Sequence, residues 1–158
     1  MLYFAYGSNL DPVQMASRCP NAKTVGLAAL HDHRLVFPRY TETWGGGTAG
    51  IVPSHGPAVW GVLFEVTDAC LATMDGHEGF RAAGDPDNHY DREQISVELT
   101  RPDDGSIPRR VRAWTYVARA ANPMPPSRRY LDTILRGARH HRLPEEYVAA
   151  LAAVAASA

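Results

Sequence analysis

The sequence predicts an α+β fold, in which a small mixed β-barrel is covered by peripheral helices. The chain has 158 residues, a length that suits one compact domain spanning residues 1–158. Six or seven short strand patterns are present, and they do not alternate regularly with helical patterns. A doubly wound parallel sheet is therefore less favoured than a small closed barrel with a few helices around it.

The opening unit is predicted to be a strand, a glycine turn and a helix. Leu2–Tyr6 is a short apolar run that stops at Gly7, which indicates a buried strand followed by a tight turn. Asp11 then suits a helix N-cap, with Pro12 at the first helical position. Pro20 ends this helix.

Apolar periodicity predicts the remaining elements. The predicted strands are Lys23–Leu30, Arg34–Phe37, Ala49–Val52, Val59–Val66, Gln94–Leu99 and Arg110–Val117. The predicted helices are Asp68–Asp75, Arg128–His140 and Glu145–Ala153. In the second of these helices, Tyr130, Ile134 and Ala138 recur at helical spacing and form an apolar stripe.

Composition and charge exclude several classes of protein. Hydrophobic residues make up 45% of the chain and the net charge is −1, so neither wholesale disorder nor general nucleic-acid binding is expected. No apolar run approaches the roughly 20 residues that a membrane span needs. The first residues lack the basic region of a signal peptide, and we expect a cytoplasmic protein.

Neither a metal centre nor a catalytic nucleophile is predicted. His31 and His33 are spaced as strand neighbours, but no carboxylate or thiolate lies at a matching spacing. Ser8 does not lie in a GxSxG motif. Cys19 and Cys70 are not in a CxxC pair, so no disulfide framework or redox role is predicted, and Cys70 is interpreted as a core residue.

Two motifs remain as candidates for chemistry. The Gly7-Ser8-Asn9 turn can aim backbone N–H groups at a carboxylate, a phosphate or an oxyanion, although a plain strand-to-helix turn is the alternative. Glu78 lies between two glycines and suits a general acid–base role if burial near aromatic residues, without a cationic partner, raises its pKa. The alternative is a solvated glutamate.

Several separated blocks are similar to one enzyme family. They are Leu2–Leu10, Thr43–Gly47, Val59–Val62, Glu78-Gly79, Pro126–Tyr130, Gly137-Ala138 and Leu143–Tyr147. Their order is collinear and they cover nearly the whole chain. On these blocks the chain resembles the γ-glutamylcyclotransferase family, and its Thr-Trp-x-Gly-Gly and Pro-Ser-x-x-Tyr blocks resemble the animal-type, AIG2-like members more than the glutathione-specific branch.

The resemblance implies a barrel with a cavity at one end and a cofactor-free reaction. In that reaction the α-amino group of a γ-glutamyl compound attacks its own γ-carbonyl, which releases 5-oxoproline and the amine. The family's catalytic glutamate matches Glu78. Its substrate-binding positions match Tyr3, Phe4, Ala5, Tyr6, Gly7, Ser8, Asn9, Tyr90, Tyr116 and Tyr130. The implied partner is a small-molecule γ-glutamyl substrate, and the implied assembly is a monomer or a homodimer.

One segment departs from the family pattern. Phe80–His89 is longer than expected, and its Gly84–Asn88 portion is typical of an exposed turn. Arg81 or His89 can then contact an unusual leaving group, or the segment can be a plain surface loop. The donor is a γ-glutamyl amino acid, a γ-glutamylamine or a γ-glutamyl-protected natural product, and a non-catalytic ligand-binding module on the same fold is a further alternative.

Overall fold

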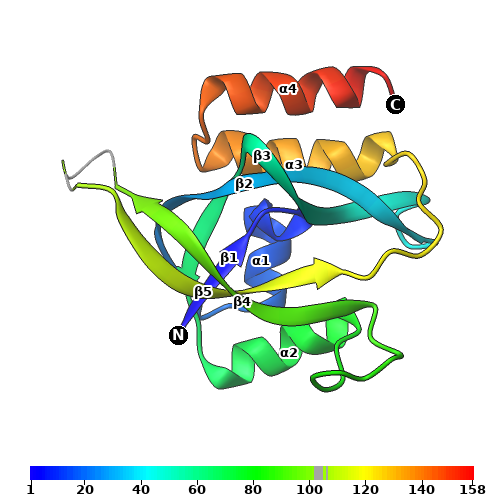
Figure 1. Cartoon of the computed structure of the whole chain (residues 1–158), viewed down its shortest axis with the longest axis horizontal. Helices are drawn as coiled ribbons and strands as arrows, with labels where there is room; N and C mark the ends of the chain where they lie inside the picture. The colour runs from blue at the N-terminus through cyan, green and yellow to red at the C-terminus, as the bar shows by residue number, and fades with distance from the viewer. Residues whose placement is uncertain (102–104, 106) are drawn as a thin grey trace.

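The computed structural model describes residues 1–101, 105 and 107–158, and its five strands close into a barrel in the order β1-β3-β2-β4-β5 (Figure 1). The strands are β1 (Leu2–Ala5), β2 (Lys23–Thr41), β3 (Gly46–Glu65), β4 (Tyr90–Thr100) and β5 (Arg109–Ala118). β1 pairs with β3 in antiparallel and with β5 in parallel orientation, so the barrel is mixed. The predicted α+β barrel is confirmed.

The prediction of six or seven short strands is wrong, because β2 and β3 each join two of the predicted strands. Asp32 adopts a φ of 55° at a bulge between His31 and His33, and pairing with β3 resumes on the far side. Further register shifts lie between Thr24 and Gly26 and between Val36 and Arg39. Bulges leave a residue unpaired without ending a strand, whereas the same residues read as breaks in the sequence.

Helices cover two sides of the barrel, with α3 and α4 stacked on one side and α2 on the other (Figure 1). Their bounds are α1 (Pro12–Arg18), α2 (Asp68–Glu78), α3 (Arg128–His140) and α4 (Glu145–Ala156), and a 3-10 helix, η1 (Ser8–Leu10), follows β1. The bounds of α3 agree with the prediction. α2 runs three residues further than predicted because Gly76 lies inside it, and a glycine in a helix interior costs only about 1 kcal/mol.

The apolar core fills the barrel and continues beneath α3. Phe4, Leu63 and Ile134 are fully buried in it. α3 lies very close to η1 at Gly137, where a Cβ atom would collide with the backbone of Leu10. This close approach fixes the position of α3 against η1, and near the other end of α3 the Tyr130 hydroxyl reaches Gly7, the residue before η1.

The two cysteines form a disulfide, contrary to the prediction that they would have no such role. Cys19 follows α1 and Cys70 lies in the first turn of α2, with Cα atoms 5.3 Å apart. They are 51 residues apart in the sequence, and only the fold brings them together. The bond ties α1 to α2.

No helix in the described part of the chain is long and apolar enough to span a bilayer.

Candidate active site

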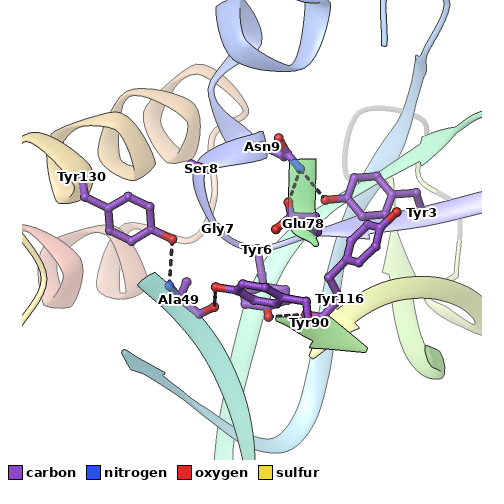
Figure 2. A pocket seen from close by; sticks show the side chains of 10 residues that line it. All are labelled: Tyr3, Tyr6, Gly7, Ser8, Asn9, Ala49, Glu78, Tyr90, Tyr116 and Tyr130. Carbon is purple, nitrogen blue, oxygen red and sulfur yellow. Dashed lines mark hydrogen bonds between the residues drawn. The ribbon is translucent and has the colours of Figure 1, made fainter. Parts of the chain in front are cut away.

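A polar cavity opens at the end of the barrel where β1 gives way to η1 (Figure 2). This inner cavity has a volume of about 320 Å³, including the solvent at its mouth. Its lining residues are Tyr3, Tyr6, Gly7, Ser8, Asn9, Ala49, Glu78, Tyr90, Tyr116 and Tyr130. The structure thus brings together all but two of the residues that the sequence proposed for the site, and it adds Ala49 from β3.

Phe4 and Ala5 are the two proposed site residues that do not line the cavity. Both are fully buried in the core. Successive side chains of a strand point to opposite faces, so the Phe4 ring turns away from the Tyr3 ring and lies near the Tyr6 ring, 6.1 Å between centroids. Ala5 is too short to reach the cavity from its strand position.

Glu78 is the carboxylate of the inner cavity, and its side chain is 17% exposed. It is the last residue of α2, and Gly79 ends the helix in the left-handed conformation with a φ of 65°. A Cβ atom at Gly79 would crowd the His89 ring, so the glycine serves both the turn and this close approach. The carboxylate is thereby fixed at the end of a rigid helix.

Burial raises the pKa of Glu78, while Arg18 and Asn9 act in the opposite direction. The Glu78 Oε1 atom lies 3.5 Å from Arg18 Nη1 and accepts a hydrogen bond from Asn9 Nδ2 at 3.3 Å. The expectation of a glutamate without a cationic partner is therefore wrong. Burial nevertheless prevails, and the raised pKa suits a group that both takes up and gives back a proton.

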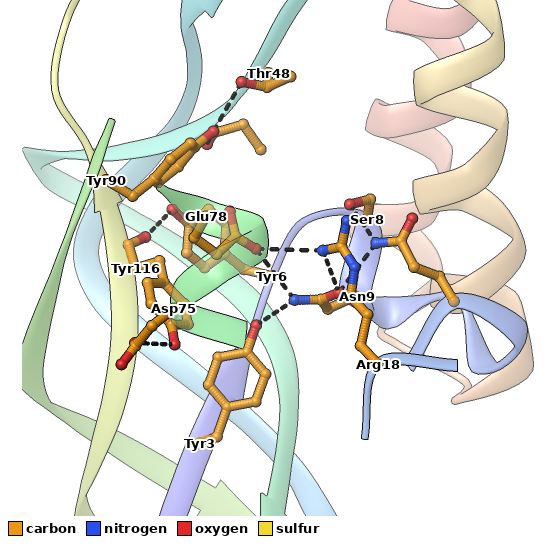
Figure 3. Close-up of polar contacts among 12 residues, drawn as sticks. Tyr3, Tyr6, Ser8, Asn9, Arg18, Thr48, Asp75, Glu78, Tyr90 and Tyr116 are labelled. Carbon is orange, nitrogen blue, oxygen red and sulfur yellow. Dashed lines mark hydrogen bonds and ion pairs between the residues drawn. The ribbon is translucent and has the colours of Figure 1, made fainter. Parts of the chain in front are cut away.

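Asn9 connects the carboxylate to three other side chains, as Figure 3 shows in part. Its Nδ2 atom also donates to the Tyr3 hydroxyl at 2.8 Å. Its Oδ1 atom accepts from Gln14 Nε2 and from Arg18 Nη1, each at 3.0 Å. Asn9 is only 3% exposed, so this network fixes the amide in one orientation and the Glu78 carboxylate with it.

Sequence reasoning missed Gln14 and Arg18. A signal was available, because the two residues are four apart on α1 and so share a helix face. That face turns toward η1, where Gln14 Nε2 also donates to the Ser8 hydroxyl at 2.7 Å.

Three of the five cavity tyrosines donate their hydroxyl protons in hydrogen bonds to other groups of the protein. Tyr6 donates to the carbonyl of Tyr116. Tyr90 donates to the carbonyl of Ala49 at 2.8 Å and shares a second hydrogen bond with Thr48. Tyr116 donates to Asp75 Oδ1 at 2.7 Å (Figure 3).

The hydroxyl protons of Tyr3 and Tyr130 remain available to a ligand. Tyr3 accepts from Asn9, and Tyr130 accepts from the backbone N–H of Ala49 at 2.8 Å. Within residues 1–101, 105 and 107–158, neither hydroxyl has an acceptor of its own. Burial raises the pKa of both phenols, so both stay protonated and able to donate at neutral pH.

The glycine-rich start of β3 explains how Tyr130 reaches the cavity. At Gly46 and Gly47 a Cβ atom would collide with the backbone of the proline-rich segment 124–127. That segment ends at Ser127, whose hydroxyl caps α3 by accepting from Tyr130 N at 3.2 Å. The Trp44 ring packs edge-on against the Tyr130 ring, 5.0 Å between centroids, which fixes the phenol over Ala49.

A wider groove continues outward from the inner cavity. This outer groove has a volume of about 700 Å³ including solvent and shares Ser8, Glu78, Tyr90 and Tyr130 with the inner cavity. Its other lining residues are Arg18, Arg39, Thr41, Thr43, Trp44, Thr48, His77 and His89.

The Phe80–His89 segment contributes to the outer groove through one of its two proposed contact residues. His89 lines the groove. Arg81 does not, because its guanidinium turns to Asp87, 3.3 Å away. In the described part of the chain, no group of three or more His, Cys, Asp or Glu side chains is arranged to hold a metal ion.

Comparisons with known proteins agree with this geometry. The family model described as gamma-glutamyl cyclotransferase, AIG2-like, matches residues 3–150. The human gamma-glutamylcyclotransferase is 33% identical over 157 residues, which cover 97% of this chain and 78% of the relative. The cattle protein of the same name is 32% identical over 150 residues, covering 92% and 74%.

A solved structure described as gamma-glutamyl cyclotransferase superimposes with a TM-score of 0.84 at 30% identity, covering 97% of this chain and 86% of its own. Sequence, fold and cavity therefore agree: this chain belongs to the gamma-glutamyl cyclotransferase, AIG2-like family.

Proposed function

We propose that the chain is a γ-glutamylcyclotransferase, in which Glu78 acts first as general base and then as general acid. The observation that carries the role of Glu78 is its position: a buried carboxylate with a raised pKa, at the boundary between a donor-rich inner cavity and an open groove. The names and identities of the relatives support the reaction itself.

The first step is proton removal from the substrate. The α-amino group of a γ-glutamyl compound is an ammonium at neutral pH and has no lone pair for attack. The ionised Glu78 carboxylate takes one proton from it, which requires that Glu78 lie within hydrogen-bond reach of the ammonium. Desolvation of the carboxylate brings its pKa closer to that of the amine and makes the transfer less uphill.

The second step is ring closure. The α-nitrogen attacks the γ-carbonyl carbon of the same molecule, a C–N bond forms, and negative charge develops on the carbonyl oxygen. The Tyr3 and Tyr130 hydroxyls are the uncommitted donors that can stabilise this oxyanion or the α-carboxylate. Because the reaction is intramolecular, holding the substrate folded in the inner cavity supplies much of the rate.

The third step is release of the amine. The former ammonium loses two protons in total as it becomes the lactam N–H of 5-oxoproline. Glu78 delivers one proton to the leaving nitrogen as its bond to the γ-carbon breaks, so the nitrogen departs as an amine and not as an amide anion. The second proton passes to water and is regained by the released amine at neutral pH.

The experiment that tests the proposal is 5-oxoproline release from γ-glutamyl-L-alanine. We expect turnover by the wild type and a loss of at least about 100-fold in Glu78→Gln, which keeps the shape of the side chain and removes the base. Glu65→Gln is the matched control, because Glu65 is exposed at the end of β3. Equal activity in the wild type and in Glu78→Gln would contradict the assigned base.

The remaining alternatives give different outcomes in the same assay. A γ-glutamylamine or γ-glutamyl-protected donor gives silence on γ-glutamyl-L-alanine but turnover of the corresponding conjugate, again abolished by Glu78→Gln. A non-catalytic binding module gives no turnover of any conjugate.

A further inference from the structure

The outer groove is lined by one arginine that no carboxylate of the described residues neutralises. Five arginines lie in or near this groove, and three of them have carboxylate partners. Arg18 contacts Glu78 at 3.5 Å, Arg81 contacts Asp87 at 3.3 Å, and Arg119 contacts Asp91 at 2.7 Å. Each of these charges is thus committed to a neighbour.

Arg129 also has no carboxylate partner in the described part of the chain, but it is exposed, and its guanidinium stacks on the Trp44 ring and donates to the carbonyl of Thr43. Arg39 differs from the other four arginines. It lies on β2, it is half-buried, and it lines the outer groove. Its only hydrogen bond in the described part of the chain is a long one, from Nη1 to the carbonyl of Arg119 at 3.4 Å. No carboxylate within residues 1–101, 105 and 107–158 pairs with it. A guanidinium can bind a carboxylate through two parallel hydrogen bonds, and Arg39 retains this capacity.

The position of the outer groove relative to Glu78 decides what it can hold. Glu78 borders both spaces, so a leaving nitrogen that receives its proton from Glu78 lies at their boundary. With the γ-glutamyl part in the inner cavity, the substituent on that nitrogen extends into the outer groove. Trp44 offers it an apolar surface there, and the Arg129 guanidinium stacks on the Trp44 ring at 4.8 Å from its centroid.

The neighbouring histidines do not compensate for Arg39 and do not add a second fixed charge. His77 and His89 line the same groove, and burial together with nearby arginines lowers the pKa of each. Both are therefore neutral at pH 7 and serve as hydrogen-bonding groups, which leaves Arg39 as the unpaired charge among the described residues that line the outer groove.

We propose that the outer groove is the leaving-group subsite, and that Arg39 binds a carboxylate on the departing amine. This inference rests on the proposed function and deepens it. The preferred donors are then γ-glutamyl conjugates whose amine carries a carboxylate. Uncharged γ-glutamylamines lose this ion pair, and cationic ones meet an unneutralised arginine.

A matched pair of substrates isolates the carboxylate. γ-Glutamyl-L-alanine and γ-glutamylethylamide have the same skeleton and differ only in the carboxylate of the leaving amine. We expect kcat/KM of the wild type to favour the alanine conjugate by about 10- to 100-fold, the range of one charge-assisted hydrogen-bonded contact. Arg39→Gln should remove this preference by lowering kcat/KM for the alanine conjugate more than for the ethylamide. Arg39→Glu should turn the preference toward γ-glutamylcadaverine, whose leaving amine is cationic.

Arg34→Gln is the control, because Arg34 is an exposed arginine on the same strand and lies outside the groove. It should keep the wild-type preference. A wild-type enzyme that turns over both substrates without preference, or an Arg39→Gln variant that keeps the preference, would overturn the role of Arg39 while the proposed function stands. Absence of turnover of either substrate by the wild type would overturn the proposed function and the subsite with it.

Discussion

The Tyr130 hydroxyl should have two separable roles, which Tyr130→Phe would remove together. In the folded protein this hydroxyl accepts the hydrogen bond of the buried Ala49 N–H at 2.8 Å. Its own proton has no acceptor in the described part of the chain. The Tyr130 side chain lines the inner cavity, as Figure 2 shows. The substitution keeps the ring and its packing against Trp44 and deletes only the oxygen.

The loss of stability in Tyr130→Phe follows from the backbone N–H of Ala49, which no longer has a hydrogen-bond acceptor. A buried N–H that loses its acceptor costs about 1–3 kcal/mol. For a domain of this length, that corresponds to a fall in Tm of roughly 2–12 °C. The catalytic cost follows from the lost O–H donor, which in a site that stabilises an oxyanion is worth about 100-fold in kcat.

Thermal unfolding and 5-oxoproline release measure the two roles independently. Both assays should be run well below the Tm of the variant, so that the folded fraction is complete in each. Tyr40→Phe is the control, because Tyr40 is an exposed tyrosine of β2, and it should change neither quantity. A variant with lowered Tm and wild-type kcat would refute the donor role and leave Tyr130 a purely structural residue.

Two further predictions concern the groups that fix α1 against α2. Arg18→Met should move the acidic limb of the kcat/KM profile to higher pH, because Arg18 lowers the pKa of Glu78 and only the ionised carboxylate is a base; an unmoved limb would contradict this. Cys19→Ser should lower the free energy of unfolding by about 4 kcal/mol, by the loop-length relation for residues 51 apart. Urea unfolding with and without dithiothreitol measures this loss, which should vanish under reducing conditions; the same midpoint for both proteins under oxidising conditions would contradict it.

Local signals were sufficient to predict most of the helices and the class of the fold. The N-cap residues Asp11 and Ser127 accept the hydrogen bonds expected of them, and the apolar stripe of α3 is buried. The strand boundaries were not predictable in the same way. A bulge such as that at Asp32 is compensated by pairing with β3, a non-local partner that the local sequence does not reveal.

In the candidate site, too, some residues could be predicted from the sequence, whereas others depend on contacts between distant parts of the chain. Glu78 was a candidate from its position between two glycines, and the resemblance added its catalytic role and Tyr130; both residues line the inner cavity. Arg18 was missed because its importance lies in a contact with Glu78, 60 residues away in the sequence. Arg39 was missed because a single arginine in a strand carries no local signal, and only the groove around it suggests a ligand. A cytoplasmic location stays a prediction, and the Cys19–Cys70 disulfide is uncommon for that compartment.

The central claim is that Glu78 is a buried base whose ionised form the fold destabilises. Its pKa is raised in the folded protein, so its contribution to stability is complete below the ordinary pKa of a glutamate and is lost as pH rises through the raised value. Glu78→Gln does not ionise and avoids that loss. The deciding measurement is Tm and kcat/KM of the wild type and Glu78→Gln across pH 4–8.

The account predicts a variant at least about 100-fold less active whose Tm at pH 7 exceeds that of the wild type, with the difference in Tm shrinking as pH falls. A variant that is inactive but less stable at pH 7 would mean that Glu78 is a structural ion-pair partner of Arg18. A variant that retains activity would contradict the mechanism itself.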